Sequence, residues 1–360
     1  MNNENHLPTM EGPVCPVPLQ HSDQVVMGHG SGGKMTMELI RDIFMPRFKC
    51  APLAAGNDFA AVGLPNLATL KGQLSISTDA HSVAPLLFPG GDIGKLAVCG
   101  TVNDVCMSGA LPLYLTASFI LEEGLSMTVL ENIVQSMRAA AEEAGVQIIA
   151  GDTKVVERGK ADGVFITTTG IGWIPDGRRI GGAEAQPGDK VLVSGYLGDH
   201  GIAVLAARGE LGFETAVQSD VAPLNHMIDT LLTAAPHTHV MRDPTRGGLA
   251  TTLNEIAHQS QVGIVLQETS IPIQPAVQAA CEMLGFDPLY VANEGKLIAI
   301  VPPDEAKDAL EAMRRSKYGE KAAIIGEVTS TPKNRVLLHT TIGSNRILDV
   351  MAGEMLPRIC

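Results

Sequence analysis

The chain lacks the run of about 18 apolar residues that a membrane-spanning helix needs. We also expect no signal peptide, because the first 24 residues contain no apolar core of the required length and include four prolines. We therefore expect a cytoplasmic protein that begins with a disordered extension over residues 1–24.

Positive charge is scarce as well. The chain has 26 Lys and Arg against 39 Asp and Glu, which gives a net charge of −13. This balance argues against nucleic acid as a partner, because its phosphates would be repelled. An acidic protein can still bind a nucleoside triphosphate when metal ions bridge its carboxylates to the phosphates.

Six cysteines are present, and none forms a C-x-x-C pair. A zinc or iron–sulfur site is therefore not expected. Cys99 and Cys106 lie seven residues apart in a helical stretch, which favours buried positions for both thiols.

Aromatic residues are few, with one Trp, four Tyr and eight Phe beside 38 Gly. This composition predicts aliphatic cores and glycine-rich connections. A chain of 360 residues can build two domains with real cores. Strands and crossing helices mix in both halves, which indicates an α/β and α+β class. We place the domains at residues 25–180 and 181–342, followed by a tail over 343–360.

Two local patterns are sharp enough to give bounds. Residues 127–144 form an amphipathic pattern that ends before Gly145, which predicts a helix over that range. Residues 146–150 read as a strand, and the sequence GDTK at 151–154 predicts a tight turn after it.

Aspartates recur beside glycines or at the ends of apolar stretches: Asp58, Asp79, Asp104, Asp152 and Asp243. Each one alone is explained by a helix cap or a turn. Their recurrence is less easily explained that way, since an unpaired carboxylate beside apolar residues is expensive. A cluster of carboxylates at strand ends is what two Mg²⁺ ions and a polyphosphate require.

Three glycine-rich segments complement the carboxylates. HGSGGK at residues 29–34 leads into a helix and offers backbone N–H groups and Lys34 to a phosphate. A flexible hinge explains this segment equally well, and the spacing of a Walker A motif is absent. GDTK at 151–154 adds a hydroxyl and an ammonium. DPTRGG at 243–248 combines a carboxylate, a guanidinium and a helix N-terminus.

The last residue, Cys360, is a thiol at the end of the chain. Chain termini are usually mobile and exposed, and Pro357 favours an extended backbone. The ending therefore predicts a flexible arm with a nucleophile at its tip, and about seven extended residues would span roughly 23–25 Å. The alternative is an accident of where the gene stops.

Taken together, these motifs resemble the ATP-site signature of the PurM-like superfamily. The matching residues are Asp58, Thr78-Asp79, Asn103-Asp104, GDT at 151–153 and DPTRGG at 243–248. Within the superfamily the chain is similar to the HypE family of hydrogenase maturation factors. That similarity rests on residues 29–33, on residues 77–110 and on the ending PRIC at 357–360.

The resemblance implies a two-domain PurM-like fold and a reaction. In the HypE family, a HypF-type carbamoyltransferase loads a carbamoyl group onto the terminal cysteine. ATP-dependent dehydration converts this group to a thiocyanate, and the cyano group passes to a HypC–HypD complex during maturation of [NiFe]-hydrogenase. The resemblance also implies a homodimer formed through the N-terminal strands, and ATP with Mg²⁺ between the domains.

The resemblance assigns expected roles to residues of this chain. Cys360 carries the substrate, and Glu294 is the candidate for taking one proton of the carbamoyl nitrogen. Lys154 is the candidate for the other proton or for stabilising the negative charge that develops. For these two the simpler interpretations, a loop carboxylate and a surface ammonium, remain open. The expected metal ligands are Asp58, Asp79, Asp104 and Asp243, and the nucleotide would also meet Lys34, Asn103, Gly151, Asp152 and Thr153.

Two rival functions remain. One is an ATP-dependent synthetase or kinase of the same superfamily that acts on a diffusible substrate. The other is a binding module whose cysteine tail only carries a group for other enzymes. Replacement of Cys360 by Ala separates the first rival from the dehydratase, and replacement of Asp79 by Asn separates the second.

Overall fold

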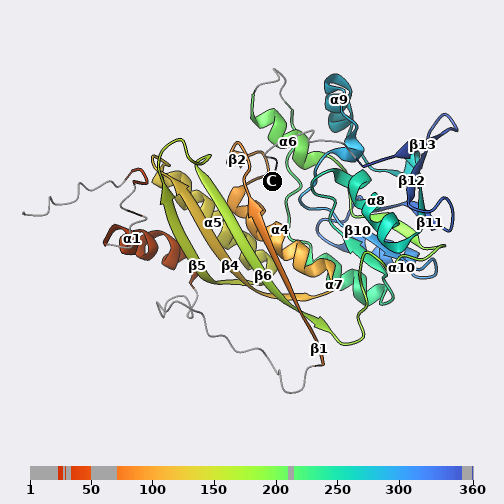
Figure 1. Ribbon diagram of the computed structural model, residues 1–360, viewed down its shortest axis with the longest axis horizontal. Coiled ribbons are helices and arrows are strands. Elements are labelled where there is room, and N and C mark those ends of the chain that lie inside the picture. The colour runs from red at the N-terminus through yellow and green to blue at the C-terminus, as the bar shows by residue number, and fades with distance from the viewer. Residues whose placement is uncertain are drawn as a thin grey trace, which may run out of the picture.

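The computed structural model describes residues 23–26, 29, 34–49, 71–209, 215–350 and 359. Two sheets with their own helices lie side by side, the N-terminal one on the left of Figure 1 and the C-terminal one on the right. The chain passes from the first sheet to the second between Pro175 and Lys190.

The described N-terminal part begins with a continuous helical segment. It comprises α1 (Lys34–Leu39), the π-helical η2 (Ile40–Phe44) and α2 (Met45–Phe48). The ring of Phe44 packs on that of Phe119 with 4.9 Å between centroids, which attaches the segment to the first sheet.

The first sheet has four strands in the order β1 (Gly72–His81), β6 (Val164–Pro175), β4 (Leu111–Glu122) and β5 (Gln147–Val156). Two helices, α4 (Ile93–Met107) and α5 (Met127–Ala144), pack on one face. The bounds of α5 are those predicted from its pattern. Gly145 ends it at φ 71°, a left-handed conformation that favours glycine.

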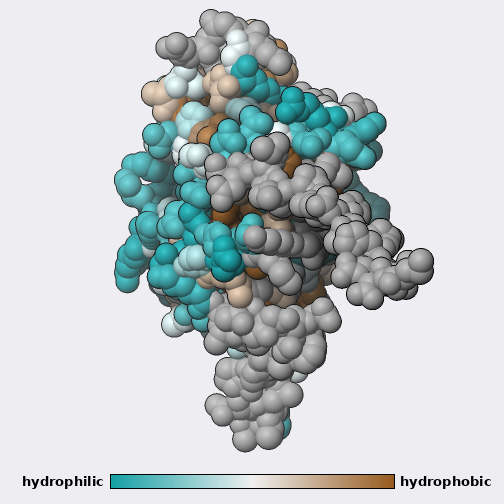
Figure 2. Space-filling view, turned by 90° about the vertical axis from the view of Figure 1, so that its left-hand side faces the viewer, coloured by the Kyte–Doolittle hydropathy of each residue, from teal (hydrophilic) through white to brown (hydrophobic). Residues whose placement is uncertain are grey.

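Within the described part of the chain, the other face of this sheet is open. Side chains of β1 alternate between the two faces, so Leu74 and Ile76 point away from the helices and are 49% and 65% exposed. Ile120 of β4 is also exposed. Figure 2 views the molecule from the side of this domain, where hydrophilic residues (teal) predominate and hydrophobic residues (brown) show in small areas.

A short hairpin of β2 (Leu87–Phe88) and β3 (Gly91–Asp92) precedes α4. The Asp92 carboxylate accepts hydrogen bonds from the backbone N–H groups of Gly94 and Lys95 at 2.7 and 3.0 Å. Asp92 is therefore an N-cap that starts α4.

The second sheet has seven strands in the order β13-β12-β9-β11-β7-β10-β8. Their bounds along the chain are β7 (Lys190–Val193), β8 (Val240–Arg242), β9 (Gly263–Gln267), β10 (Ile298–Val301), β11 (Ala323–Thr329), β12 (Arg335–His339) and β13 (Asn345–Leu348).

Helices cover both faces of the central strands. They are α6 (Asp199–Ala207), α7 (Asn225–Ala234), α8 (Gly248–Ser260), α9 (Pro275–Leu284) and α10 (Ala306–Arg315), with short 3-10 turns η3 (Glu268–Ser270) and η4 (Pro288–Tyr290). On β7, Leu192 belongs to the core that includes α7, whereas Val191 and Val193 belong to the core that includes α8. Burial on both faces explains why these strands read as continuous apolar runs.

Three sequence expectations can be compared directly with this fold. Cys99 and Cys106 are buried free thiols, as predicted. The predicted tail over residues 343–360 is wrong at its start, because residues 345–348 form β13 at the edge of the sheet. Among the described residues, no helix is both long enough and apolar enough to cross a membrane.

Candidate active site between the two domains

Three of the predicted carboxylates lie close enough for their charges to shift one another's pKa values, although they come from distant segments of the chain. Asp79 lies on β1, Asp104 lies on α4, and Asp243 directly follows β8 of the second sheet. Ser77 donates a hydrogen bond from its hydroxyl to Oδ2 of Asp104 at 2.8 Å. We call Asp79, Asp104 and Asp243 the acidic cluster.

Among the described residues, no Lys or Arg side chain forms an ion pair with the acidic cluster. Burial, followed by the charges of Asp104 and Asp79, raises the pKa of Asp243 to about 7. Burial and the charge of Asp79 likewise raise the pKa of Asp104. The guanidinium of Arg242 opposes both rises, but it forms an ion pair with Glu255. The cluster therefore holds excess negative charge.

Such a cluster suits a hard divalent cation, which prefers carboxylate oxygens. Within the described part of the chain, however, no three His, Cys, Asp or Glu side chains come close enough to hold a metal ion. The fourth predicted ligand, Asp58, lies outside the described residues. The donor chemistry fits Mg²⁺, and the described carboxylates alone do not form a finished site.

A buried histidine lies against the acidic cluster. His81 is 2% exposed, and its Nε2 is 3.6 Å from Oδ2 of Asp79. Neither ring nitrogen has a hydrogen-bond partner. Burial lowers the pKa of His81 more than Asp79 raises it. A Cβ at Gly100 of α4 would lie 3.1 Å from Cε1 of this ring, so the glycine lets the helix approach the imidazole.

Glu294 occupies the loop before β10 and is 5% exposed. Burial, then the charges of Asp220, Asp243, Asp79 and Asp104, raise its pKa well above the usual range. Its Oε1 has no hydrogen-bond partner. The predicted loop carboxylate is thus a buried group whose pKa is raised by burial and by the charges of the whole acidic cluster.

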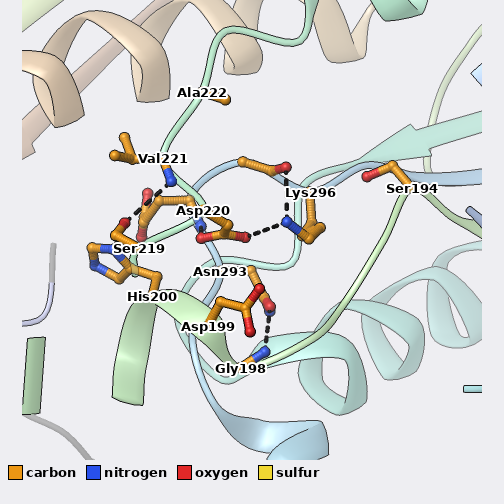
Figure 3. Close-up of polar contacts among 12 residues, drawn as sticks. Ser194, Gly198, Asp199, His200, Ser219, Asp220, Val221, Ala222, Asn293 and Lys296 are labelled. Carbon is orange, nitrogen blue, oxygen red and sulfur yellow. Dashed lines mark hydrogen bonds and ion pairs between the residues drawn. The ribbon is translucent and has the colours of Figure 1, made fainter. Parts of the chain in front are cut away.

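A second group of polar side chains adjoins Glu294. We call His200, Ser219, Asp220 and Lys296 the docking cluster; Figure 3 shows these residues. Nζ of Lys296 is 2.9 Å from Oδ2 of Asp220, and the two side chains are 8% and 3% exposed. The backbone N–H of Glu294 donates to Oδ1 of Asp220 at 3.0 Å. Burial would raise the pKa of Asp220. The charge of Lys296, followed by His200 and the hydrogen bond from Glu294, holds this pKa below its usual value.

The end of the chain meets this docking cluster. His200 lies near the start of α6 and is fully buried. Its Nε2 is 2.7 Å from the carbonyl oxygen of Ile359, and its Nδ1 is 2.8 Å from Oγ of Ser219. Ile359 is 3% exposed and belongs to the core shared with the first domain. The penultimate residue therefore lies inside the molecule, whereas Cys360, bonded to it, falls outside the described residues.

Asn103 joins the two domains through its side-chain amide. Its Nδ2 donates to the carbonyl of Ala222 at 3.0 Å, and its Oδ1 accepts from the N–H of Leu224 at 2.8 Å. Both ends of the amide are thus used to hold the segment that follows Asp220. The predicted contact between Asn103 and a nucleotide remains a prediction.

The predicted tight turn at residues 151–154 is wrong. These residues lie inside the edge strand β5, which pairs in parallel with β4. A Cβ at Gly151 would lie 2.7 Å from the carbonyl oxygen of Ala117, so close strand approach explains the glycine. Asp152 and Lys154 are exposed, and Thr153 lies between them half-buried.

The sheet order separates these β5 residues from the acidic cluster in one chain. Strands β6 and β4 lie between β1 and β5, and three spacings of about 4.8 Å make roughly 14 Å. The structure therefore does not bring Lys154 next to Asp79 within a single chain. Lys34 is the first residue of α1, and its side chain is not described.

Asp220, Lys296 and Ser219 are functional candidates that no motif in the sequence predicted, and the same holds for His200. A signal for Asp220 was available, because a lone carboxylate follows Val217 and precedes Val221 and Ala222. Its partner Lys296 is far away in sequence, so no local pattern could join them.

Comparison with known proteins places this arrangement in a family. The domain described as "AIR synthase related protein, N-terminal domain" matches residues 56–174, and the corresponding C-terminal domain matches residues 186–339. The carbamoyl dehydratase HypE of Cupriavidus necator is 54% identical over 339 residues, which cover 94% of this chain and 95% of that protein. The chain belongs to the HypE family.

Solved structures agree with this assignment. A crystal structure of the hydrogenase maturation protein HypE in complex with ATP has a TM-score of 0.88 at 49% identity, and covers 93% of this chain and 99% of the other. A HypE chain from a HypE–HypF complex has a TM-score of 0.75 at 49% identity, covering 87% and 99%. The predicted resemblance and the two-domain PurM-like fold are confirmed.

Proposed function

We propose that this HypE family member dehydrates a carbamoyl group on its own terminal thiol. The starting group is Cys360–S–C(=O)–NH₂, and the products are Cys360–S–C≡N, ADP and phosphate. The carbonyl oxygen leaves as part of the phosphate, while the nitrogen loses two protons. Phosphorylation is needed because oxide is a poor leaving group and phosphate is a good one. The cyano group would serve the maturation of [NiFe]-hydrogenase.

The observation that carries this proposal is the position of Ile359. A residue one peptide bond from the terminal thiol is buried beside the docking cluster, which adjoins Glu294. Glu294 in turn is affected by the charges of the acidic cluster. A module that only presented its thiol to other proteins would have no need to bury the end of its chain there.

The acidic cluster is the natural place for the cation and the phosphates. Asp79, Asp104 and Asp243, with Asp58, would hold Mg²⁺, which would neutralise phosphate charge when bound. Lys34, Asn103, Gly151, Asp152 and Thr153 remain the proposed nucleotide contacts. The ATP complex of a 49% identical HypE supports this use of the fold.

Proton transfer is assigned to Glu294 and Lys154. Burial, then the charges of Asp220 and the acidic cluster, raise the pKa of Glu294 well above its usual value. Neutralisation of the acidic cluster would lower this pKa toward the range of a useful base. Lys154 is exposed on β5, so its part in the reaction requires a contact that a single chain does not provide.

The proposed partners are a HypF-type carbamoyltransferase, a HypC–HypD complex and a second copy of the chain. The complex of a related HypE with HypF supports the first. The open face of the first sheet, with Leu74 and Ile76 exposed, supports the last. A homodimer through this face would also give Lys154 new neighbours.

Intact mass spectrometry tests the reaction. The protein is incubated with HypF, carbamoyl phosphate and Mg²⁺, first without and then with ATP for the second step. We expect a carbamoyl adduct on Cys360 that loses one water when ATP is supplied. An adduct that never loses water refutes the dehydratase.

Two variants address the rival functions. Cys360→Ala should abolish all turnover, and continued turnover of a diffusible substrate would support a free-standing synthetase instead. Asp79→Asn should stop the loss of water while loading continues. Unchanged delivery of a cyano group by that variant would identify a pure carrier.

Light scattering after gel filtration tests the homodimer. Ile76→Lys should produce monomers, because a charge on the open face would be buried in the interface. Ile347→Lys is the matched control, since Ile347 is 58% exposed on β13 of the other sheet. Dimers that persist in the first variant, or dissociate in both, contradict this interface.

A further inference from the structure

We propose that His200 is a positioning residue that holds the end of the chain in the site, with Ser219 setting its tautomer. This inference rests on the proposed function for its purpose, but not for its geometry. It assigns to the docking cluster a task that neither the acidic cluster nor Glu294 can perform, namely fixing the backbone next to the thiol.

The hydrogen bonds around His200 have only one consistent polarity in the neutral ring. The carbonyl of Ile359 can only accept, so Nε2 must donate across the 2.7 Å separation. Nδ1 is then the acceptor, and the hydroxyl of Ser219 donates to it at 2.8 Å. Oγ of Ser219 accepts in turn from the N–H of Val221 at 3.1 Å. This chain of three bonds fixes which nitrogen carries the proton.

The surroundings favour the neutral ring. His200 is fully buried, and the ring of Phe88 from the β2–β3 hairpin meets it edge to face at 5.4 Å. Burial is the main cause that lowers the pKa of His200. Among the described residues His200 is the one hydrogen-bond partner of Ile359, so its loss leaves a buried carbonyl unsatisfied.

Both domains hold this arrangement in place. The N–H of Ser219 donates to the carbonyl of Pro89 at 2.8 Å. Gly90 has φ 93°, and a Cβ there would lie 2.7 Å from the carbonyl oxygen of Ser219. The glycine therefore allows the hairpin to approach the segment that carries both Ser219 and Asp220. His200 thus links the chain end to a rigid frame that also carries the Asp220–Lys296 ion pair.

The test measures how fast the thiol of Cys360 is alkylated in the full-length protein without ATP or carbamoyl donor. Samples are pulsed with iodoacetamide, and the modified peptide is quantified by mass spectrometry. In His200→Asn the amide takes the place of Nδ1 but does not reach Ile359, so we expect alkylation about tenfold faster than in the unmodified protein. In His200→Gln the amide nitrogen can replace the Nε2 donor, and the rate should return to within about twofold.

Controls separate positioning from loss of folding. His239→Asn removes another paired histidine of the same domain, one that contacts Asp189 at 2.7 Å, and should leave the Cys360 rate unchanged. The buried thiol of Cys281 should stay protected in every variant. If His200→Asn exposes Cys281, the variant Ser219→Ala is used in its place. In that variant we expect the Cys360 thiol to be alkylated about threefold faster, because the tautomer of His200 is no longer fixed.

The inference is overturned if the folded His200→Asn or its replacement reacts at the unmodified rate, or if His200→Gln reacts as fast as His200→Asn. A second measurement ties it to chemistry: loss of water from the carbamoyl adduct should slow in His200→Asn and recover in His200→Gln. If the unmodified protein itself loses no water, the proposed function fails, while the alkylation result still decides the role of His200.

Discussion

The acidic cluster and the docking cluster are neighbours that balance their charges in opposite ways. In the acidic cluster, Asp104 and Asp79 raise the pKa of Asp243, and among the described residues no Lys or Arg pairs with any of the three; Asp79 has only the buried His81 at 3.6 Å, whose pKa is lowered by burial. In the docking cluster, Asp220 has a lysine at 2.9 Å and an N–H donor at 3.0 Å. Glu294 adjoins both and is affected by the carboxylates of each.

This difference distinguishes a cluster whose charges are paired within the chain from one whose charges call for a bound cation. The docking cluster is complete with protein groups alone, since its intended occupant is a part of the same chain. The acidic cluster carries negative charge that no Lys or Arg in the described part of the chain pairs with, which leaves a place for an added cation. Removal of one paired side chain should therefore destabilise the docking cluster, whereas removal of one carboxylate should reduce the repulsion within the acidic cluster.

The largest effect is expected from Lys296→Met. This change leaves Asp220 charged and buried without its partner, which should cost about 3–5 kcal/mol of unfolding free energy. Urea unfolding followed by circular dichroism measures it. The double variant Lys296→Met with Asp220→Asn is the control and should recover much of the loss. A loss below about 1 kcal/mol in the single variant would show that the pair does not stabilise the docking cluster.

Asp199 gives a pH test at the edge of the docking cluster. It is 6% exposed, and burial raises its pKa to about 6, with Asp220 adding to the rise and Lys296 opposing it. The folded state therefore binds more protons than the unfolded state between pH of about 4 and 6, and stability falls as pH rises through that window.

Asp199→Asn removes this titration. Relative to the unmodified chain, the variant should gain about 2 kcal/mol at pH 8 and nothing near pH 3.5. Urea unfolding at both pH values provides the comparison, and Asp308→Asn on α10 is a control carboxylate remote from the cluster. An equal gain at both pH values would rule out the carboxylate charge as its source.

The smallest effect is expected from Asp104→Asn in metal-free buffer. Loss of one of three repelling carboxylates should raise stability by about 1 kcal/mol and reduce the further gain produced by adding Mg²⁺. Thermal unfolding with EDTA and then with Mg²⁺ measures both. Asp152→Asn, on the exposed edge strand, should change neither. Destabilisation by Asp104→Asn in EDTA would mean that the acidic cluster is already balanced.

The sequence predicted those features that depend on local patterns. Residues 127–144 bury one stripe and end at a left-handed glycine, so both the helix and its bounds followed from periodicity. At residues 151–154 the local turn signal was outweighed by pairing with β4, which is a tertiary effect.

The site was predictable only in part. The acidic residues could be recognised in the sequence because they interrupt apolar stretches. In the structure Asp79, Asp104 and Asp243 lie close enough for their charges to affect one another's pKa values. Asp220 and Lys296 could not be paired in advance, because the contact depends on how loops from different parts of the second domain meet. His200 was equally hidden, since its significance comes from a contact with the other end of the chain.

The burial of Ile359 has a practical consequence for anyone who handles this protein. A purification tag fused after residue 360 would have to extend from a backbone whose preceding residue is 3% exposed. Such a fusion would have to lead out of the core one residue after Ile359, which competes with the burial of that side chain. Tags therefore belong at the other end of the chain.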